Sequence, residues 1–301
     1  KYKEAEQAFV RATKLNPKHS KAFSNLASLF RHNGKFETAL EFARQSTTIT
    51  PDNPEALNNL GNAEWDCGFN KNAVKNYRKA VFIQPDFALA HWNLALALLA
   101  LGKFSEGFNE MAWRWKWNNF PGKRRYFEQP IWDGERLDKK TILLYPEQGL
   151  GDTIQFMRYS TLVRKFARRV ILELPAELVP LANHSALADE IVIESGKGLE
   201  FDYHAPFLDL PRILRTTPAT IPADVPYLAI DKKLQSKYRG LADKYTGLRI
   251  GVNWSGNQIN PIDKFRRIPM DELKYLFDSP GVHWFSLQKD GKSTNTPVKN
   301  K

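Results

Sequence analysis

Apolar residues in the first hundred positions recur at helical spacing, in a unit that repeats every 34 residues. Four sets of residues keep this period, namely Pro17, Pro51 and Pro85; Gly34, Gly68 and Gly102; Leu26, Leu60 and Leu94; and Ala5, Ala39 and Ala73. In each unit a glycine separates two helical patterns and a proline follows the second. This arrangement predicts an array of paired helices over residues 1–118.

An asparagine precedes the repeated leucine of each unit, at Asn25, Asn59 and Asn93. These side chains should share one face of the array, where amides offer donors and acceptors to an extended peptide. We therefore predict peptide binding at the three asparagines, with little effect on stability when all three become alanine. The alternative is a solvated residue common to such repeats.

Residues 113–132 read WRWKWNNFPGKRRYFEQPIW and are rich in aromatic and basic side chains. We interpret residues 119–139 as a cap and linker between the helical array and the next domain. Stacking of nucleobases or sugars is the alternative use of such a segment.

Beyond residue 139 the pattern changes to alternating strands and helices. Strands are predicted at 141–145, 170–174, 190–194 and 201–204, and helices at 152–168 and 176–183. Residues 140–246 should thus form a Rossmann-like α/β domain with a mainly parallel sheet. Residues 247–301 resume with a strand from Leu248, a helix over Met270–Phe277 and a strand over Val282–Leu287.

The first predicted strand runs directly into a glycine loop, EQGLGD, and then into a helix. Glycines let a ligand approach the backbone, and the helix N-terminus favours an anion or developing negative charge. Because ligands gather beyond the carboxyl ends of parallel strands, the candidate cleft residues are Glu147, Gln148, Gly149, Gly151 and His204.

Two residues of this region also have purely structural interpretations. Asp152 followed by Gln155 matches a helix capping box, and His204 could be a hydrogen-bonded structural residue. The loop is neither G-x-G-x-x-G nor a P-loop, so dinucleotide or nucleoside triphosphate binding does not follow.

Composition and charge limit the kinds of partner that the chain can have. The net charge of +11 is spread along the chain, which disfavours nucleic acid, and no apolar run is long enough for a membrane span. A single cysteine, Cys67, fits a reducing cytoplasm. No D-x-D carboxylate pair occurs, so a metal-chelated diphosphate is not supported. We predict no metal site and no bound cofactor.

The 34-residue unit resembles the tetratricopeptide repeat. With EQGLGDTIQFMRY, PIWDGERL, FDYHAP, IPADVPYL and GVNWSGN followed by FRRIP and SLQ, the whole chain resembles the bacterial tetratricopeptide-repeat glycosyltransferases. These are related to the heptosyltransferases and distantly to O-GlcNAc transferase. The implied architecture is an α-solenoid, one Rossmann-like half of a GT-B fold, and the start of a second half.

The resemblance also implies roles for particular residues. Asp152 matches the base that deprotonates the acceptor hydroxyl, and the predicted donor-phosphate residues are Asn253, Ser255, Gly256, Lys264, Arg266 and Arg267. The family usually has Arg-Ser-Ile where this chain has Arg-Arg-Ile, so which cation meets phosphate stays open.

The implied function is an inverting, metal-independent transfer of a hexose, pentose or heptose from a nucleotide sugar. The repeats would recruit a protein or glycan-carrier acceptor. Lys1 falls inside a repeat and the family's Asp-Thr-x-x-x-His donor segment is absent, so we expect a chain truncated at both ends and inactive by itself. The alternative is a non-catalytic scaffold for protein interactions.

Overall fold

The computed structural model describes residues 2–122, 124–193, 198–256 and 263–288. The chain divides into two compact units, Lys1–Ala229 and Ile230–Lys301, earlier than the boundary after residue 246 that the sequence pattern indicated. The reason is that the segment up to Ala229 is tied to the first unit. The Tyr227 hydroxyl donates to the Ile154 carbonyl, and the Ala229 N–H donates to Ser185 Oγ.

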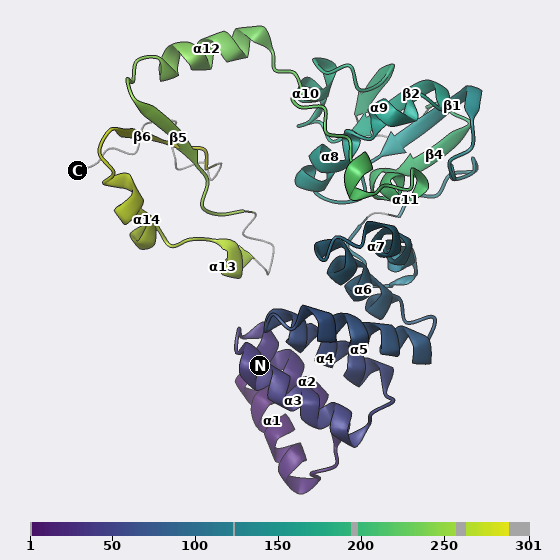
Figure 1. Ribbon diagram of the computed structural model, residues 1–301, viewed down its shortest axis with the longest axis vertical. Helices are drawn as coiled ribbons and strands as arrows, with labels where there is room; N and C mark the ends of the chain where they lie inside the picture. Colours follow the sequence, from purple (N-terminus) through teal and green to yellow (C-terminus); the bar gives the residue numbers. More distant parts are fainter. Residues whose placement is uncertain (1, 123, 194–197, 257–262, 289–301) are drawn as a thin grey trace. The chain divides into compact units, whose positions relative to one another are not determined.

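The first part of unit one consists of helices joined by short turns (Figure 1). In chain order they are α1 (Tyr2–Leu15), α2 (Ser20–His32), α3 (Phe36–Ile49), α4 (Pro54–Asp66), α5 (Asn70–Ile83), α6 (Ala88–Ala100) and α7 (Phe104–Met111). Gly34, Gly68 and Gly102 lie between paired helices with φ of 76°, 82° and 74°. Glycine adopts this left-handed conformation without steric cost, so the predicted helix pairs and their turns are confirmed.

Small buried residues let the paired helices approach closely. Ala39, Ala43, Ala73 and Ala80 are fully buried. At Gly61, a Cβ atom would lie 2.6 Å from the ring of Tyr77, so α4 and α5 meet where only glycine fits.

The second part of unit one is built on a four-stranded parallel sheet of order β3-β2-β1-β4. The strands are β1 (Leu137–Tyr145), β2 (Ala167–Leu174), β3 (Glu190–Ile193) and β4 (Tyr203–Pro206). The predicted parallel α/β sheet is therefore confirmed, with β4 two residues later than expected.

The helix predicted over residues 152–168 is wrong in extent. The chain instead forms α8 (Leu150–Met157) and α9 (Ser160–Val163), and Ala167 to Arg169 belong to β2. They are drawn into the sheet because Ala167 pairs with Leu137 and Arg169 with Thr141 of β1. Shorter helices complete the domain, namely α10 (Val179–Asn183), α11 (Leu210–Ile213) and the 3-10 helices η2 (Phe207–Asp209) and η3 (Pro218–Thr220).

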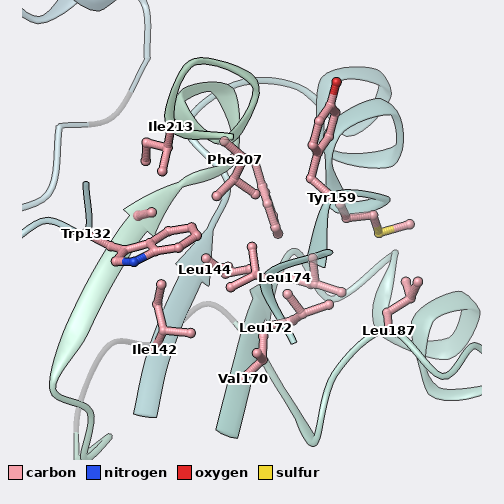
Figure 2. Packing of buried hydrophobic residues seen from close by; sticks show 14 of the residues in the cluster. Trp132, Ile142, Leu144, Tyr159, Val170, Leu172, Leu174, Leu187, Phe207 and Ile213 are labelled. Carbon is pink, nitrogen blue, oxygen red and sulfur yellow. The ribbon is translucent and has the colours of Figure 1, made fainter. Parts of the chain in front are cut away.

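The main core lies on one face of this sheet. Figure 2 shows Ile142 and Leu144 of β1 with Val170, Leu172 and Leu174 of β2. Trp132, from the aromatic segment, is fully buried in the same core. On the opposite face, Phe127 packs with Leu143, Tyr145 and Ile171. The segment read as a linker thus contributes aromatic side chains to both faces of the sheet.

Unit two contains α12 (Lys232–Ala242), a parallel pair of strands, β5 (Leu248–Val252) and β6 (Val282–Ser286), and the helices α13 (Asp263–Arg266) and α14 (Met270–Phe277). The bounds of α14 match the prediction. Leu273 and Phe277 of α14 pack against Trp284 of β6 in a small core.

Candidate functional site at the end of the first strand

The glycine loop lies at a change of direction in the sheet. From β1 the chain adds β2 and then β3 on one side, and later adds β4 on the other side of β1. The loop after β1 and the η2 turn after β4 therefore border the same crevice. Ligands of open parallel sheets bind at such a point.

Helix α8 begins earlier than predicted, which changes the role of Asp152. Gly149 is the N-cap residue, and no side chain caps the helix, so the capping-box interpretation of Asp152 is wrong. Asp152 lies in the first helical turn and is half-buried. Its Oδ2 lies 3.7 Å from where a Cβ of Gly149 would be. Its carboxylate is therefore close to the backbone of the loop.

The loop backbone itself is open to solvent. Gly149 and Gly151 are exposed, and Gln148 is half-buried. A Cβ at Gly151 would meet nothing within 4 Å. These glycines and Asp152 form the accessible part of the candidate site, with the N-terminal N–H groups of α8 behind them.

Glu147 does not belong to this accessible part, contrary to its prediction as a cleft residue. Its side chain is fully buried and accepts two bonds from Arg114, Nε to Oε1 at 2.5 Å and Nη2 to Oε2 at 2.8 Å. Arg114 Nη1 also donates to Asp209 Oδ1 at 2.8 Å. We call Arg114, Glu147 and Asp209 the buried charge triad. It is held by the end of the repeats and by the loops after β1 and β4.

The triad holds one cation and two carboxylates, all removed from water. Burial raises the pKa of Glu147 to about 7, although the Arg114 bonds and charge oppose the rise and Asp209 adds to it. For Arg114, burial lowers the pKa while Glu147 and Asp209 raise it, with a net rise. The guanidinium thus stays charged, and the protonation of Glu147 is sensitive near neutral pH.

His204 also lies in a different place from the prediction. It is buried inside β4, paired with Leu143, rather than beyond the carboxyl end of the strand. Its Nδ1 is 3.2 Å from the Tyr145 hydroxyl, and Phe127 packs over it. Burial lowers its pKa, so it is a neutral residue of the sheet interior.

The aromatic segment joins the repeats to the crevice. After α7 comes the 3-10 helix η1 (Ala112–Lys116), in which Trp113 stacks on His91 at 4.0 Å between ring centroids. Phe108 and Met111 of the last repeat pack with Leu208 of η2. Sequence reasoning missed Arg114 and Asp209. Asp209 carried a usable signal, since it is a carboxylate shortly after a buried strand.

Two of the three repeat asparagines bond to the neighbouring helix. Asn59 Nδ2 donates to Ser24 Oγ at 2.7 Å, and Asn93 Nδ2 donates to Asn58 Oδ1 at 2.9 Å. Asn25 makes no side-chain hydrogen bond within the described part of the chain. A pocket of about 290 Å³ lies beside Asn25 and Asn59, and its other lining residues are Ser20, Lys21, Ser24, Ser46, Thr50, Asn53, Glu55 and Ala56. Each amide keeps hydrogen-bonding capacity for a ligand in this pocket.

These interhelical bonds alter the expected effect of alanine on stability. We expect Asn59→Ala to lower the free energy of unfolding by about 0.5–1.5 kcal/mol, because a part-buried bond between α2 and α4 is lost. Asn25→Ala, at the same repeat position, is the matched control and should change stability by less. Thermal unfolding of the two variants, followed by circular dichroism, makes the comparison; equal stability would show that the Asn59 bond contributes nothing.

The predicted donor-phosphate residues lie in unit two, after β5. The N–H of Ser255 bonds to Gln288 Oε1 at 3.2 Å, and the N–H of Gly256 bonds to Asp263 Oδ1 at 2.8 Å. Asn253 Oδ1 also accepts from the Ser255 N–H at 3.3 Å. The N–H groups of Ser255 and Gly256 thus already have acceptors.

The predicted cations follow this loop. Arg266 and Arg267 are exposed, and the side chain of Lys264 lies outside the described residues. Within the described ranges there is no cluster of histidine, cysteine and carboxylate side chains able to hold a metal ion. No helix among them is long and apolar enough to span a membrane.

Comparison with known families identifies the repeats. Residues 1–54 match a family described as tetratricopeptide repeat, and residues 61–102 match one described as TPR repeat. The predicted tetratricopeptide repeats are confirmed over these residues.

Longer similarities are weaker. Protein FlbA of Caulobacter vibrioides is 24% identical over 307 residues, which cover 95% of this chain and 52% of FlbA. The chain therefore spans about half the length of that relative. An O-GlcNAc transferase mutant from Thermobaculum terrenum is 20% identical, with 62% of this chain and 37% of that chain covered and a TM-score of 0.36. MamA from Desulfovibrio magneticus RS-1 is 19% identical, with 37% and 63% covered and a TM-score of 0.34.

Proposed function

We propose that this chain is the acceptor-binding part of a glycosyltransferase that uses a nucleotide sugar. Its tetratricopeptide repeats recruit a protein or glycan-carrier acceptor, and the glycine loop receives the acceptor hydroxyl. The observation that carries the proposal is the solvent-accessible segment Gly149–Asp152, the N-cap and first turn of α8, at the direction change of a parallel sheet.

The chemistry assigned to this loop needs a base and stabilisation of a leaving group. Asp152 takes the proton of the acceptor hydroxyl as its oxygen attacks the sugar carbon from the face opposite the nucleotide, which inverts that carbon. The leaving phosphate is stabilised by cations and helix N-termini rather than a metal. Lys264, Arg266 and Arg267 of unit two are the candidate cations.

Recruitment by the repeats follows from the asparagine pocket. Asn25 and Asn59 line it, and an extended peptide backbone presents the donors and acceptors that amides pair with. A peptide held in this pocket is thereby attached to the chain that carries the glycine loop. Its side-chain hydroxyls are the candidate acceptors.

A transfer assay tests the proposal. The natural full-length protein is incubated with radiolabelled UDP-, GDP- or ADP-sugars and an extract of cells that lack its gene. We expect label to enter a macromolecular acceptor, and to do so equally in EDTA. No incorporation from any of the sugars would count against the transferase.

A non-catalytic scaffold is the second candidate function. It is favoured by the N–H groups of Ser255 and Gly256, which Gln288 and Asp263 already occupy, so a phosphate must displace them. Calorimetric titration of the natural protein with UDP, GDP and ADP separates the two functions. Affinity for one nucleotide supports the transferase, and retained peptide binding without nucleotide affinity supports the scaffold.

A further inference from the structure

A second pocket of unit one lies apart from the glycine loop and the asparagine pocket, and shares no lining residue with either. Its volume is about 350 Å³. It lies between α7, the last repeat helix, and the turn that begins with α11. The lining residues are Ser105, Phe108, Asn109, Asp133, Pro211, Arg212, Ile213, Arg215 and Thr216.

Arg212 carries a buried donor that has no acceptor. Its Nε is inaccessible to solvent and makes no hydrogen bond. Neither Arg212 nor Arg215 forms an ion pair with any residue that the structure describes. The contrast is Arg114, whose guanidinium binds two carboxylates. Arg212 thus lines the pocket with no carboxylate among the described residues to neutralise it, so its positive charge is available to an anionic ligand there.

Arg215 is held in an unusual backbone conformation at the same pocket. Its φ is 50°, the left-handed region that residues other than glycine rarely adopt, and no other non-glycine residue in the described ranges has a positive φ. The turn is fixed by bonds from the Arg215 N–H to the Arg212 carbonyl and from the Thr216 N–H to the Pro211 carbonyl. One constrained turn thus supplies both guanidinium groups.

We infer that this pocket binds an oxyanion, the carboxylate or phosphate group of a ligand. Guanidinium groups present planar pairs of donors that match the oxygens of either anion. Ser105 and Asn109 supply neutral donors from α7, and Phe108 and Ile213 supply apolar contact. The site does not depend on the proposed glycosyl transfer.

Asp133 sets the charge balance of the pocket. It is exposed and lines the same cavity, so the lining carries two positive charges and one negative charge. A bound oxyanion is therefore attracted by the arginines and repelled by Asp133. Removing an arginine should therefore lower the affinity for the anion, and removing Asp133 should raise it. The direction of each change tests the inference.

The experiment follows the arginine Nε–H signals of the chain by NMR during titration with inorganic phosphate and, separately, with acetate. We expect the Arg212 signal to shift saturably with at least one anion. It should do so at lower anion concentrations than the signals of Arg78 and Arg249, which are exposed and paired with carboxylates. Tighter binding of phosphate identifies a phosphate group as the ligand chemistry, and tighter binding of acetate identifies a carboxylate.

Three variants complete the test. Arg212→Gln should lower the affinity for the anion by roughly tenfold, and Asp133→Asn should raise that affinity several-fold. Asp138→Asn changes the net charge equally but lies outside the pocket, so it should leave the affinity unchanged. If Arg212→Gln unfolds the protein, the increase in anion affinity expected of Asp133→Asn still tests the site. An Arg212 signal that shifts only together with Arg78 and Arg249, or equal effects of the two aspartate variants, would overturn the site.

Discussion

Arg114→Met should lower the free energy of unfolding of unit one by about 3–5 kcal/mol, because it leaves two buried carboxylates without a cation. Arg114 and the Glu147 side chain are fully buried, and the Asp209 side chain is 7% exposed. Urea unfolding followed by tryptophan fluorescence measures the loss, since Trp113 and Trp115 flank Arg114 in the chain.

The loss should also depend on pH. Burial raises the folded-state pKa of Glu147 from 4.5 to about 7, so its favourable contribution is complete below pH 4.5 and disappears as the pH rises through 7. Removing Arg114 takes away the group that opposes this rise. The deficit of Arg114→Met should therefore be larger at about pH 8 than at about pH 5.

Two variants serve as controls for Arg114. Arg136→Met removes an ion pair with Asp138 in which both side chains are more than 60% exposed, 66% and 63%, and should cost at most about 1 kcal/mol. Glu147→Gln leaves Arg114 balanced by Asp209, so it should cost less than Arg114→Met and flatten the pH dependence. A loss with Arg114→Met no larger than that with Arg136→Met would show that the triad is not a stabilising link.

Asp152→Asn should reduce sugar transfer by the natural full-length protein by about 10²-fold or more, because an amide cannot accept the acceptor's proton. The fold should be nearly unaffected. Asp152 caps no helix by a side-chain bond, and its charge near the N-terminus of α8 contributes about 0.3–1 kcal/mol. The turnover of the two proteins is compared at saturating acceptor and nucleotide sugar.

The matched control for this variant is Asp138→Asn, which removes an exposed carboxylate of β1 away from the loop. It should transfer sugar at the normal rate. If Asp152→Asn also transfers sugar at the normal rate and its stability is unchanged, Asp152 is not the base. It then contributes only a negative charge at the start of α8.

The repeats and the glycine loop could be predicted because their signals are local. Packing of one helix pair on the next requires the same small or apolar residue once per unit, so Ala39 and Ala73 and Leu26 and Leu60 reveal the period directly. The step from β1 to the loop and helix is likewise a change from strand to helical spacing within a few residues.

Element boundaries were less predictable, because partners far along the chain set them. Ala167 and Arg168 end the helix predicted over 152–168 but lie in β2, because Ala167 pairs with Leu137 of β1. Helix α12 was not predicted at all, although Leu234, Tyr238 and Leu241 keep helical spacing; none of its residues is buried.

The sequence by itself thus determined the repeat architecture, the parallel α/β domain and the glycine turn after β1, since each depends on residue spacing within one or two elements. Only the tertiary structure decided which side chains of the candidate site are accessible. Glu147 and Asp152 are only five residues apart, yet Glu147 is buried in the loop and Asp152 is half-exposed in the first turn of α8. The reason is Arg114, which lies 33 residues before Glu147 and 95 before Asp209 and which local patterns cannot pair with either carboxylate.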